Sequence, residues 1–111
     1  MSKKFKIKQS KPLKMAKGIQ GMPIGLKKLM VNLVALDKDA IVPEHTHKHE
    51  QSTFIFNGEL MFELEGERFM LGPGDGILIP ANASHSARAT RPTLAYDCFC
   101  PPRRDYLSKL K

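Results

Sequence analysis

The amino-acid sequence predicts a single all-β domain of the sandwich or barrel type. Short apolar or alternating segments recur about every 8–12 residues, and Gly, Pro, Asn and Asp separate them. No segment keeps the 3.6-residue apolar period of a long helix. The chain has 111 residues, which is enough for one domain with one hydrophobic core and leaves no room for a second catalytic domain.

The first quarter of the chain carries the weakest strand signals. Residues 1–27 are rich in Lys and Gly and contain Pro12 and Pro23. We interpret them as a basic lead-in that holds at most a short edge strand near Phe5–Ile7 or an arm reaching a dimer partner. The β-barrel itself is expected to occupy residues 28–111.

From Leu29 the pattern becomes that of β-strands. Leu29–Leu36 is mostly apolar and contains two valines, so it predicts the first strand. Residues 59–65 alternate, with apolar side chains on one face, and Asn57-Gly58 before them is a strong hairpin signal. The remaining expected strands are Ile41–Pro43, Phe54–Phe56, Arg68–Leu71, Ile77–Ile79, Ser86–Ala89 and Thr93–Phe99. Residues 104–111 are expected to form one helical turn.

Charge and composition exclude several classes of protein. Residues 1–36 carry nine Lys and no acidic residue, whereas the rest of the chain has nine basic and eleven acidic residues. A basic segment can attract nucleic acid, but only Phe5 is available to stack on bases, so a nucleic-acid partner is not expected. No apolar run reaches the length of a membrane span, and no signal peptide is seen, so a cytoplasmic protein is expected. Two cysteines are too few for a disulfide framework.

Three of the four histidines lie within five positions. Residues two apart on an extended strand project to the same side, so His45 and His47 can converge on one metal ion, and Gln51 has the same parity. His85, where a later strand begins, can complete the set. Three imidazoles and one oxygen suit Zn, Ni, Fe or Mn. The alternative is a polar loop whose histidines face water, and His49 is expected beside the site or at its rim.

These residues resemble the two sequence motifs of the cupin family. His45-Thr46-His47 is followed by Gln51 and, after six further residues, by Gly58. The second motif is matched by Gly72-Pro73-Gly74-Asp75, which leads to Pro80 and then His85. The resemblance covers residues 29–107 and implies the double-stranded β-helix, or jelly-roll barrel, of cupins. It also implies one divalent transition metal, such as Ni, Zn, Mn or Fe, held by His45, His47, Gln51 and His85. Gln51 replaces the usual Glu, which resembles a three-His, one-Gln subgroup.

The end of the predicted barrel resembles cupins related to the pectin-degradation protein. Residues 97–103 read Asp-Cys-Phe-Cys-Pro-Pro-Arg, the ending of that subgroup. The resemblance implies that Asp97 is catalytic, that Arg103 is catalytic and binds substrate, and that Phe99 binds substrate. Alternatively, Asp97 is a surface charge or an acceptor behind the ligands, Arg103 pairs with Asp105, and Phe99 belongs to the core.

The reaction that this subgroup implies is the ring opening, or isomerisation, of a 4,5-unsaturated uronate, a sugar acid. A small carboxylate-bearing ligand and a homodimer with a crossing N-terminal segment are therefore expected. Two alternatives remain: a non-catalytic cupin that contains metal and binds an effector or a sugar, and an Fe(II)-dependent dioxygenase. The sequence alone does not decide whether the protein is an enzyme.

Overall fold

The computed structural model describes residues 4–6 and 12–108, which form ten strands and one short helix. The strands are β1 (Leu13–Ala16), β2 (Ile19–Gly25), β3 (Met30–Leu36), β4 (Ile41–His45), β5 (Glu50–Asn57), β6 (Leu60–Leu64), β7 (Glu67–Leu71), β8 (Gly76–Ile79), β9 (His85–Ala89) and β10 (Thr93–Cys100). Helix α1 (Arg104–Ser108) follows β10. The all-β prediction is confirmed. Among the described residues, no helix is long and apolar enough to cross a membrane.

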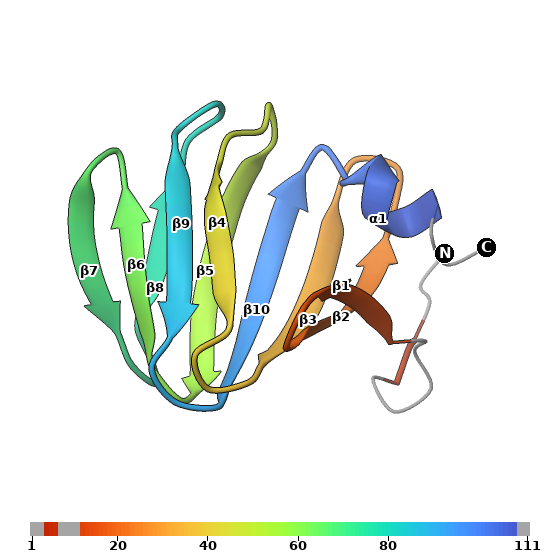
Figure 1. The fold of residues 1–111 in the computed structure, drawn as a ribbon. Helices are drawn as coiled ribbons and strands as arrows, with labels where there is room; N and C mark the ends of the chain where they lie inside the picture. Colours follow the sequence, from red (N-terminus) through yellow and green to blue (C-terminus); the bar gives the residue numbers. More distant parts are fainter. Residues whose placement is uncertain (1–3, 7–11, 109–111) are drawn as a thin grey trace.

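The strands form two antiparallel sheets that face each other (Figure 1). One sheet has six strands in the order β1-β2-β3-β10-β5-β8, and the other has four in the order β4-β9-β6-β7. Alternate residues of β3 and β10 are buried, as expected for strands with one face on a core. The core lies between the sheets and includes Ile19, Val34, Leu36, Ile55, Leu60, Phe62, Leu71, Ile79, Ala89 and Ala95.

A row of polar side chains crosses the inner face of the six-stranded sheet. Asp97 on β10 pairs in register with Asn32 on β3 and with Thr53 on β5. Residues paired across antiparallel strands project to the same face. Asn32 and Thr53 are buried, so this row is a polar band inside an otherwise apolar barrel. Burying such polar groups costs free energy unless they make hydrogen bonds. The polar band therefore marks a part of the core that is a candidate for a binding or catalytic role.

Strands β1 and β2 lie within residues 1–27, where the sequence predicted a lead-in with at most a short edge strand or a dimer arm. Strand β2 pairs with β3 along its full length, and β1 forms the edge of the sheet. The composition hides β2 because Gly21, Pro23 and Gly25 lie in it. Strand β1 pairs with only the first part of β2, so Pro23 has an open edge on that side. A missing N–H costs no hydrogen bond of the sheet there. Of the edge strand expected at Phe5–Ile7, Phe5 and Lys6 are not in a strand, and Ile7 lies outside the described residues.

Gly58 closes the turn between β5 and β6 with a φ of 94°. A Cβ at this position would collide with the backbone oxygen of Pro92 and with Thr93. We expect Gly58→Ala to lower the free energy of unfolding by about 2–5 kcal/mol, because left-handed strain adds to overpacking against rigid backbone. Urea unfolding measures this loss.

The matched control for Gly58→Ala is Gly74→Ala. Gly74 has a φ of 88°, but a Cβ there would meet no described atom within 4 Å. This variant should therefore lose only the backbone term, about 1–2 kcal/mol. Equal losses in the two variants would show that the contact with Pro92 is unimportant.

Candidate metal centre

Three histidines form one cluster. Two of them lie on the paired strands β4 and β9, and the third lies in the loop that follows β4. His45 ends β4 and His85 begins β9, and the two residues pair in register. Their ring centroids are 4.2 Å apart. His47 lies past the end of β4, in the loop before β5, and its ring centroid is 4.8 Å from that of His85. One ligand atom from each residue lies within 4.8 Å of the others.

Each ring of the cluster is held by a backbone carbonyl that accepts a hydrogen bond from Nδ1. The acceptors are Pro43 for His45 at 2.8 Å, His49 for His47 at 3.0 Å and Ala83 for His85 at 2.9 Å. With the proton on Nδ1, the Nε2 lone pair of each ring is free to bind a metal. The Nε2 of His85 is buried and has no hydrogen-bond partner among the described residues. Burial lowers the pKa of His47 and of His85, which favours the neutral, ligating form. The three-His cluster therefore fits a metal site.

Gln51, the second residue of β5, supplies an oxygen to the same place. Its Oε1 is 3.0 Å from Nε2 of His47. When Nδ1 of His47 carries the proton, these two atoms are both electron-pair donors, and two such atoms at this distance repel each other unless a cation is shared between them. Gln51 therefore lies beside the three-His cluster, and its role as the fourth ligand stays a prediction.

His49 is not part of the cluster. Its side chain is half-buried, and its ring makes edge contacts with His47 and Phe99. Its backbone carbonyl, not its side chain, accepts the hydrogen bond from His47 Nδ1. The place expected for His49, beside the site, is where the structure has it.

A chain of hydrogen bonds joins the cluster to Asp97. Gln51 Nε2 donates to Thr53 Oγ1 at 2.9 Å, and Thr53 Oγ1 donates to Asp97 Oδ1 at 2.7 Å. Asp97 lines the cavity, and burial of its carboxyl raises its pKa to about 6, against the lowering effects of these hydrogen bonds and of the Arg103 charge. Thr53 escaped the sequence analysis, although it shares the strand face of Gln51.

Phe99 and Arg103 also reach the site. Phe99 is 2% exposed, and its ring contacts that of His47 at a centroid distance of 5.9 Å, so it is both a core residue and a wall beside the cluster. Arg103 pairs with Asp105 through Nε–Oδ1 at 3.1 Å and Nη2–Oδ2 at 2.9 Å. The pairing with Asp105 that the sequence left open is therefore present, and Arg103 still lines the cavity.

One cavity of about 80 Å³ connects these groups. It is lined on the polar side by His45, Gln51, Thr53, His85, Asp97, Arg103 and Tyr106. The other lining residues are mostly apolar side chains of the core. Tyr106, on α1, was not singled out in the sequence, because a tyrosine in a short C-terminal segment carries no motif. The arrangement brings a carboxyl group, a guanidinium and imidazoles of the three-His cluster to one small space.

Comparison with known proteins agrees with this arrangement. The cupin domain family matches residues 32–97. The pectin degradation protein KdgF of Dickeya dadantii (strain 3937) is 31% identical over 81 residues, which are 71% of this chain and 74% of that protein. The structure of KdgF from Halomonas sp. superposes with a TM-score of 0.90 at 31% identity, over 96% of this chain and 99% of that one. An RmlC-like cupin from Shewanella frigidimarina NCIMB 400 gives a TM-score of 0.88 at 26% identity, over 95% and 96% of the two chains.

Proposed function

The chain belongs to the cupin domain family, and on that premise we propose that it is a metal-dependent enzyme that opens the ring of a 4,5-unsaturated uronate. The observation that carries the proposal is the position of Asp97, which lines one cavity with Arg103 and with His45 and His85 of the three-His cluster. The similarity to two KdgF proteins, one of them named for pectin degradation, supports the substrate class.

The reaction is an isomerisation that moves one proton. The substrate is a cyclic enol ether with a hemiacetal carbon. The bond between that carbon and the ring oxygen breaks, the hemiacetal hydroxyl loses its proton and becomes an aldehyde, and the double-bond carbon next to the former enol carbon gains a proton as a ketone forms. Asp97 is the group that moves this proton, since it is the carboxyl that lines the cavity. Thr53 holds the Asp97 carboxyl in place through its 2.7 Å hydrogen bond.

His45, His47, His85 and Gln51 would hold the divalent metal. When bound, the metal supplies a Lewis acid that orients and polarises a substrate oxygen. Because Gln51 is neutral where a carboxylate is usual, the four ligands leave the dication its full charge. The ligand set contains no base, so the proton must move through Asp97.

Arg103 binds the carboxylate of the substrate, and Phe99 gives the sugar ring an apolar wall. A guanidinium binds a carboxylate through two parallel hydrogen bonds, which fixes the plane of the acid as well as its position. The low exposure of the Arg103 side chain, 13%, strengthens this attraction relative to one in bulk water.

The test is the loss of ultraviolet absorbance of a 4,5-unsaturated uronate when metal-loaded protein is added. We expect the loss to stop after chelation, to return with added metal, and to yield the linear keto acid by nuclear magnetic resonance. No loss with one metal bound per chain would overturn the proposal and favour a binding role. Consumption of O₂ with Fe(II) would instead indicate a dioxygenase.

The outer face of the six-stranded sheet supports a homodimer as part of this proposal. Phe54, Phe56 and Leu78 are exposed there, at 44%, 46% and 79%. The Phe56 ring packs edge-on against Phe54 and Tyr96, so the apolar side chains form one patch. The outward residues between β3 and β8 include Val31, Leu33, Ala35, Glu50, Ser52, Phe54, Phe56, Leu78, Leu94, Tyr96, Cys98 and Cys100. Glu50, at the start of β5, is the charged side chain among them, and the part of the face around Phe54 and Phe56 is uncharged, which fits a second copy of the same face better than a charged partner.

We expect the double variant Phe54→Glu, Phe56→Glu to be a monomer, because like charges would meet across a two-fold interface. Light scattering measures the mass of the wild type and the variant. The control is Met70→Glu, which adds a charge at an exposed apolar residue of the four-stranded sheet and should leave a dimer. A monomeric wild type would refute the dimer.

A further inference from the structure

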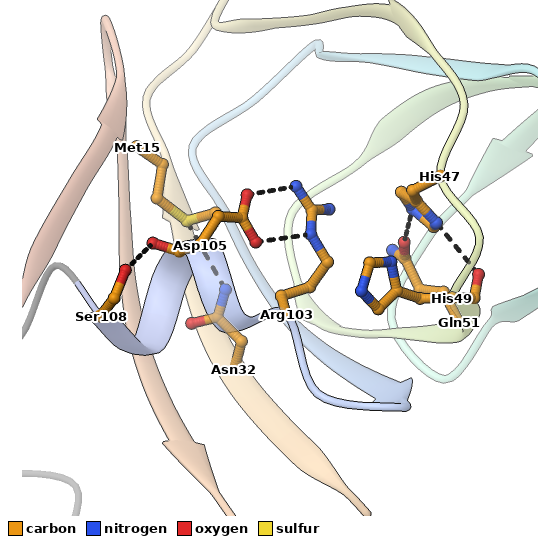
Figure 2. A network of polar contacts seen from close by, with 8 residues as sticks. All are labelled: Met15, Asn32, His47, His49, Gln51, Arg103, Asp105 and Ser108. Carbon is orange, nitrogen blue, oxygen red and sulfur yellow. Dashed lines mark hydrogen bonds and ion pairs between the residues drawn. The ribbon is translucent and has the colours of Figure 1, made fainter.

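Asp105 binds the guanidinium of Arg103 on the side that faces away from the histidines. Figure 2 shows Asp105 on one side of the guanidinium and His47 and His49 on the other. Asp105 accepts from Nε at 3.1 Å and from Nη2 at 2.9 Å. A guanidinium has five N–H groups, and this pairing uses the two that lie along its Nε edge. The N–H groups of the opposite edge, on Nη1 and Nη2, are paired with no carboxylate among the described residues, so a carboxylate of a ligand can bind there.

The plane of the guanidinium is fixed as well as its edge. The central carbon of the Arg103 guanidinium lies 4.2 Å from the ring centroid of Tyr106 and 5.6 Å from that of Phe99. A cation over aromatic rings is held by the ring electrons, and a planar guanidinium also stacks on them. With one edge bound by Asp105 and its face against Tyr106, the Arg103 side chain has little freedom to turn.

Residues 102–108, which include Asp105 and Tyr106, are packed against the barrel. Pro102, just before Arg103, is fully buried. Leu107 of α1 packs where a side chain at Gly25 would lie, and Arg104 Nη2 donates to the Lys27 carbonyl at 3.0 Å. Helix α1 therefore lies on the end of β2 as a fixed support (Figure 1). A group held by supports that are themselves fixed is preorganised for its ligand.

We propose that Asp105 and Tyr106 are positioning residues that present the free edge of Arg103 to the cavity and so make the site selective for a carboxylate over its neutral ester. This proposal rests on the proposed function and deepens it. A carboxylate offers two acceptor oxygens to the two parallel N–H groups of that edge. A methyl ester offers one carbonyl oxygen and no negative charge, so it gains little from a fixed guanidinium.

The test compares a 4,5-unsaturated uronate with its methyl ester in the wild type and in Asp105→Asn. The amide of Asn accepts from Nε–H, but its NH₂ group meets Nη2 donor to donor, so the guanidinium turns. We expect the KM for the acid to rise about tenfold, with kcat changed less than about twofold and the ester kinetics unchanged. Tyr106→Leu removes the stacked ring and should act in the same direction.

The matched control is Glu63→Gln, which removes another carboxylate–arginine contact, that of Glu63 with Arg68 at 2.7 Å, on strands of the other sheet. It should leave the preference for the acid unchanged. An equal loss for acid and ester in Asp105→Asn would indicate a merely structural role and overturn the proposal, as would an unchanged preference for the acid.

Binding experiments separate failure of this proposal from failure of the proposed function. If the wild type opens no unsaturated uronate, the proposed function fails, and the comparison is made by calorimetry with galacturonate and galactose. Tighter binding of galacturonate that Asp105→Asn reduces by about tenfold supports the positioning role. The same preference in both proteins, or none in the wild type, overturns it.

Discussion

Replacing His47 with alanine is expected to abolish metal binding and to leave the fold intact. The variant keeps the core between the two sheets, because His47 lies in a loop and contributes no apolar side chain to that core. It loses one of three imidazoles whose Nε2 atoms are held toward one point by backbone carbonyls. Even residues behind the ligands change metal affinity about 10–100-fold, so loss of a ligand should cost more than about 100-fold.

Metal content and thermal unfolding measure this result. The wild type should hold one metal per chain and unfold at a higher temperature with metal than without it, because a ligand that binds only the folded state stabilises it. The His47→Ala variant should unfold at the temperature of the metal-free wild type, with or without added metal.

The matched control is His49→Ala. It removes a neighbouring imidazole but keeps the carbonyl of residue 49, which holds the His47 ring. We expect it to bind metal nearly as well as the wild type. A full complement of metal in His47→Ala, or its loss in His49→Ala, would contradict the assignment of the cluster.

Replacing Asp97 with asparagine is expected to lower turnover by about 10²–10⁴-fold, the usual contribution of a positioned acid or base. The amide oxygen can still accept the hydrogen bond from Thr53 Oγ1, so the side chain should keep its place. The amide cannot take up or release the proton that the reaction moves. Initial rates with the unsaturated uronate measure the loss, and metal content should stay at one per chain.

Thermal unfolding of Asp97→Asn shows whether the variant loses turnover because it lacks the carboxyl group or because it is unfolded. Burial raises the pKa of Asp97 from 3.8 to about 6, so the folded state disfavours the ionised carboxylate relative to the unfolded chain. The stability associated with this group is fully present below pH 3.8 and is lost as the pH rises through about 6. At pH 7, Asp97→Asn should therefore unfold at the same temperature as the wild type or a higher one. Normal turnover would refute the role of Asp97.

The sequence predicts the strands that carry the candidate site better than it predicts how the site residues converge. The parity argument for His45, His47 and Gln51 assumed one extended strand, whereas β4 ends at His45 and Gln51 lies on β5, so motif spacing and not parity brought Gln51 into the candidate set. The convergence of His47 was predicted from an extended strand, but the structure has it in a loop, with its ring held by the His49 carbonyl. Backbone hydrogen bonds in loops leave no periodic pattern in the sequence. The place of His47 in the candidate site was therefore predicted only through the motif resemblance.

The parts that the sequence did not predict depend on contacts between distant segments. Thr53 is significant only because its register partner on β10 is Asp97. Tyr106 is significant only because the chain turns back after β10 and stacks its ring on Arg103. Strand β2 was missed for another reason, since local propensity argues against a strand that contains Gly21, Pro23 and Gly25 and tertiary pairing with β3 overrides it.

Strand β10 has a different environment on each of its two sides. Ala95, Asp97 and Phe99 point into the barrel, whereas Tyr96 and Cys98 point to the apolar outer face. Neighbouring residues of a strand are about 3.3 Å apart, so a shift of the backbone that accommodates a new partner surface is transmitted to the next carboxyl or ring inside. If the proposed dimer and the proposed reaction both hold, oligomeric state and catalytic rate are expected to change together among variants of Tyr96 and Cys98.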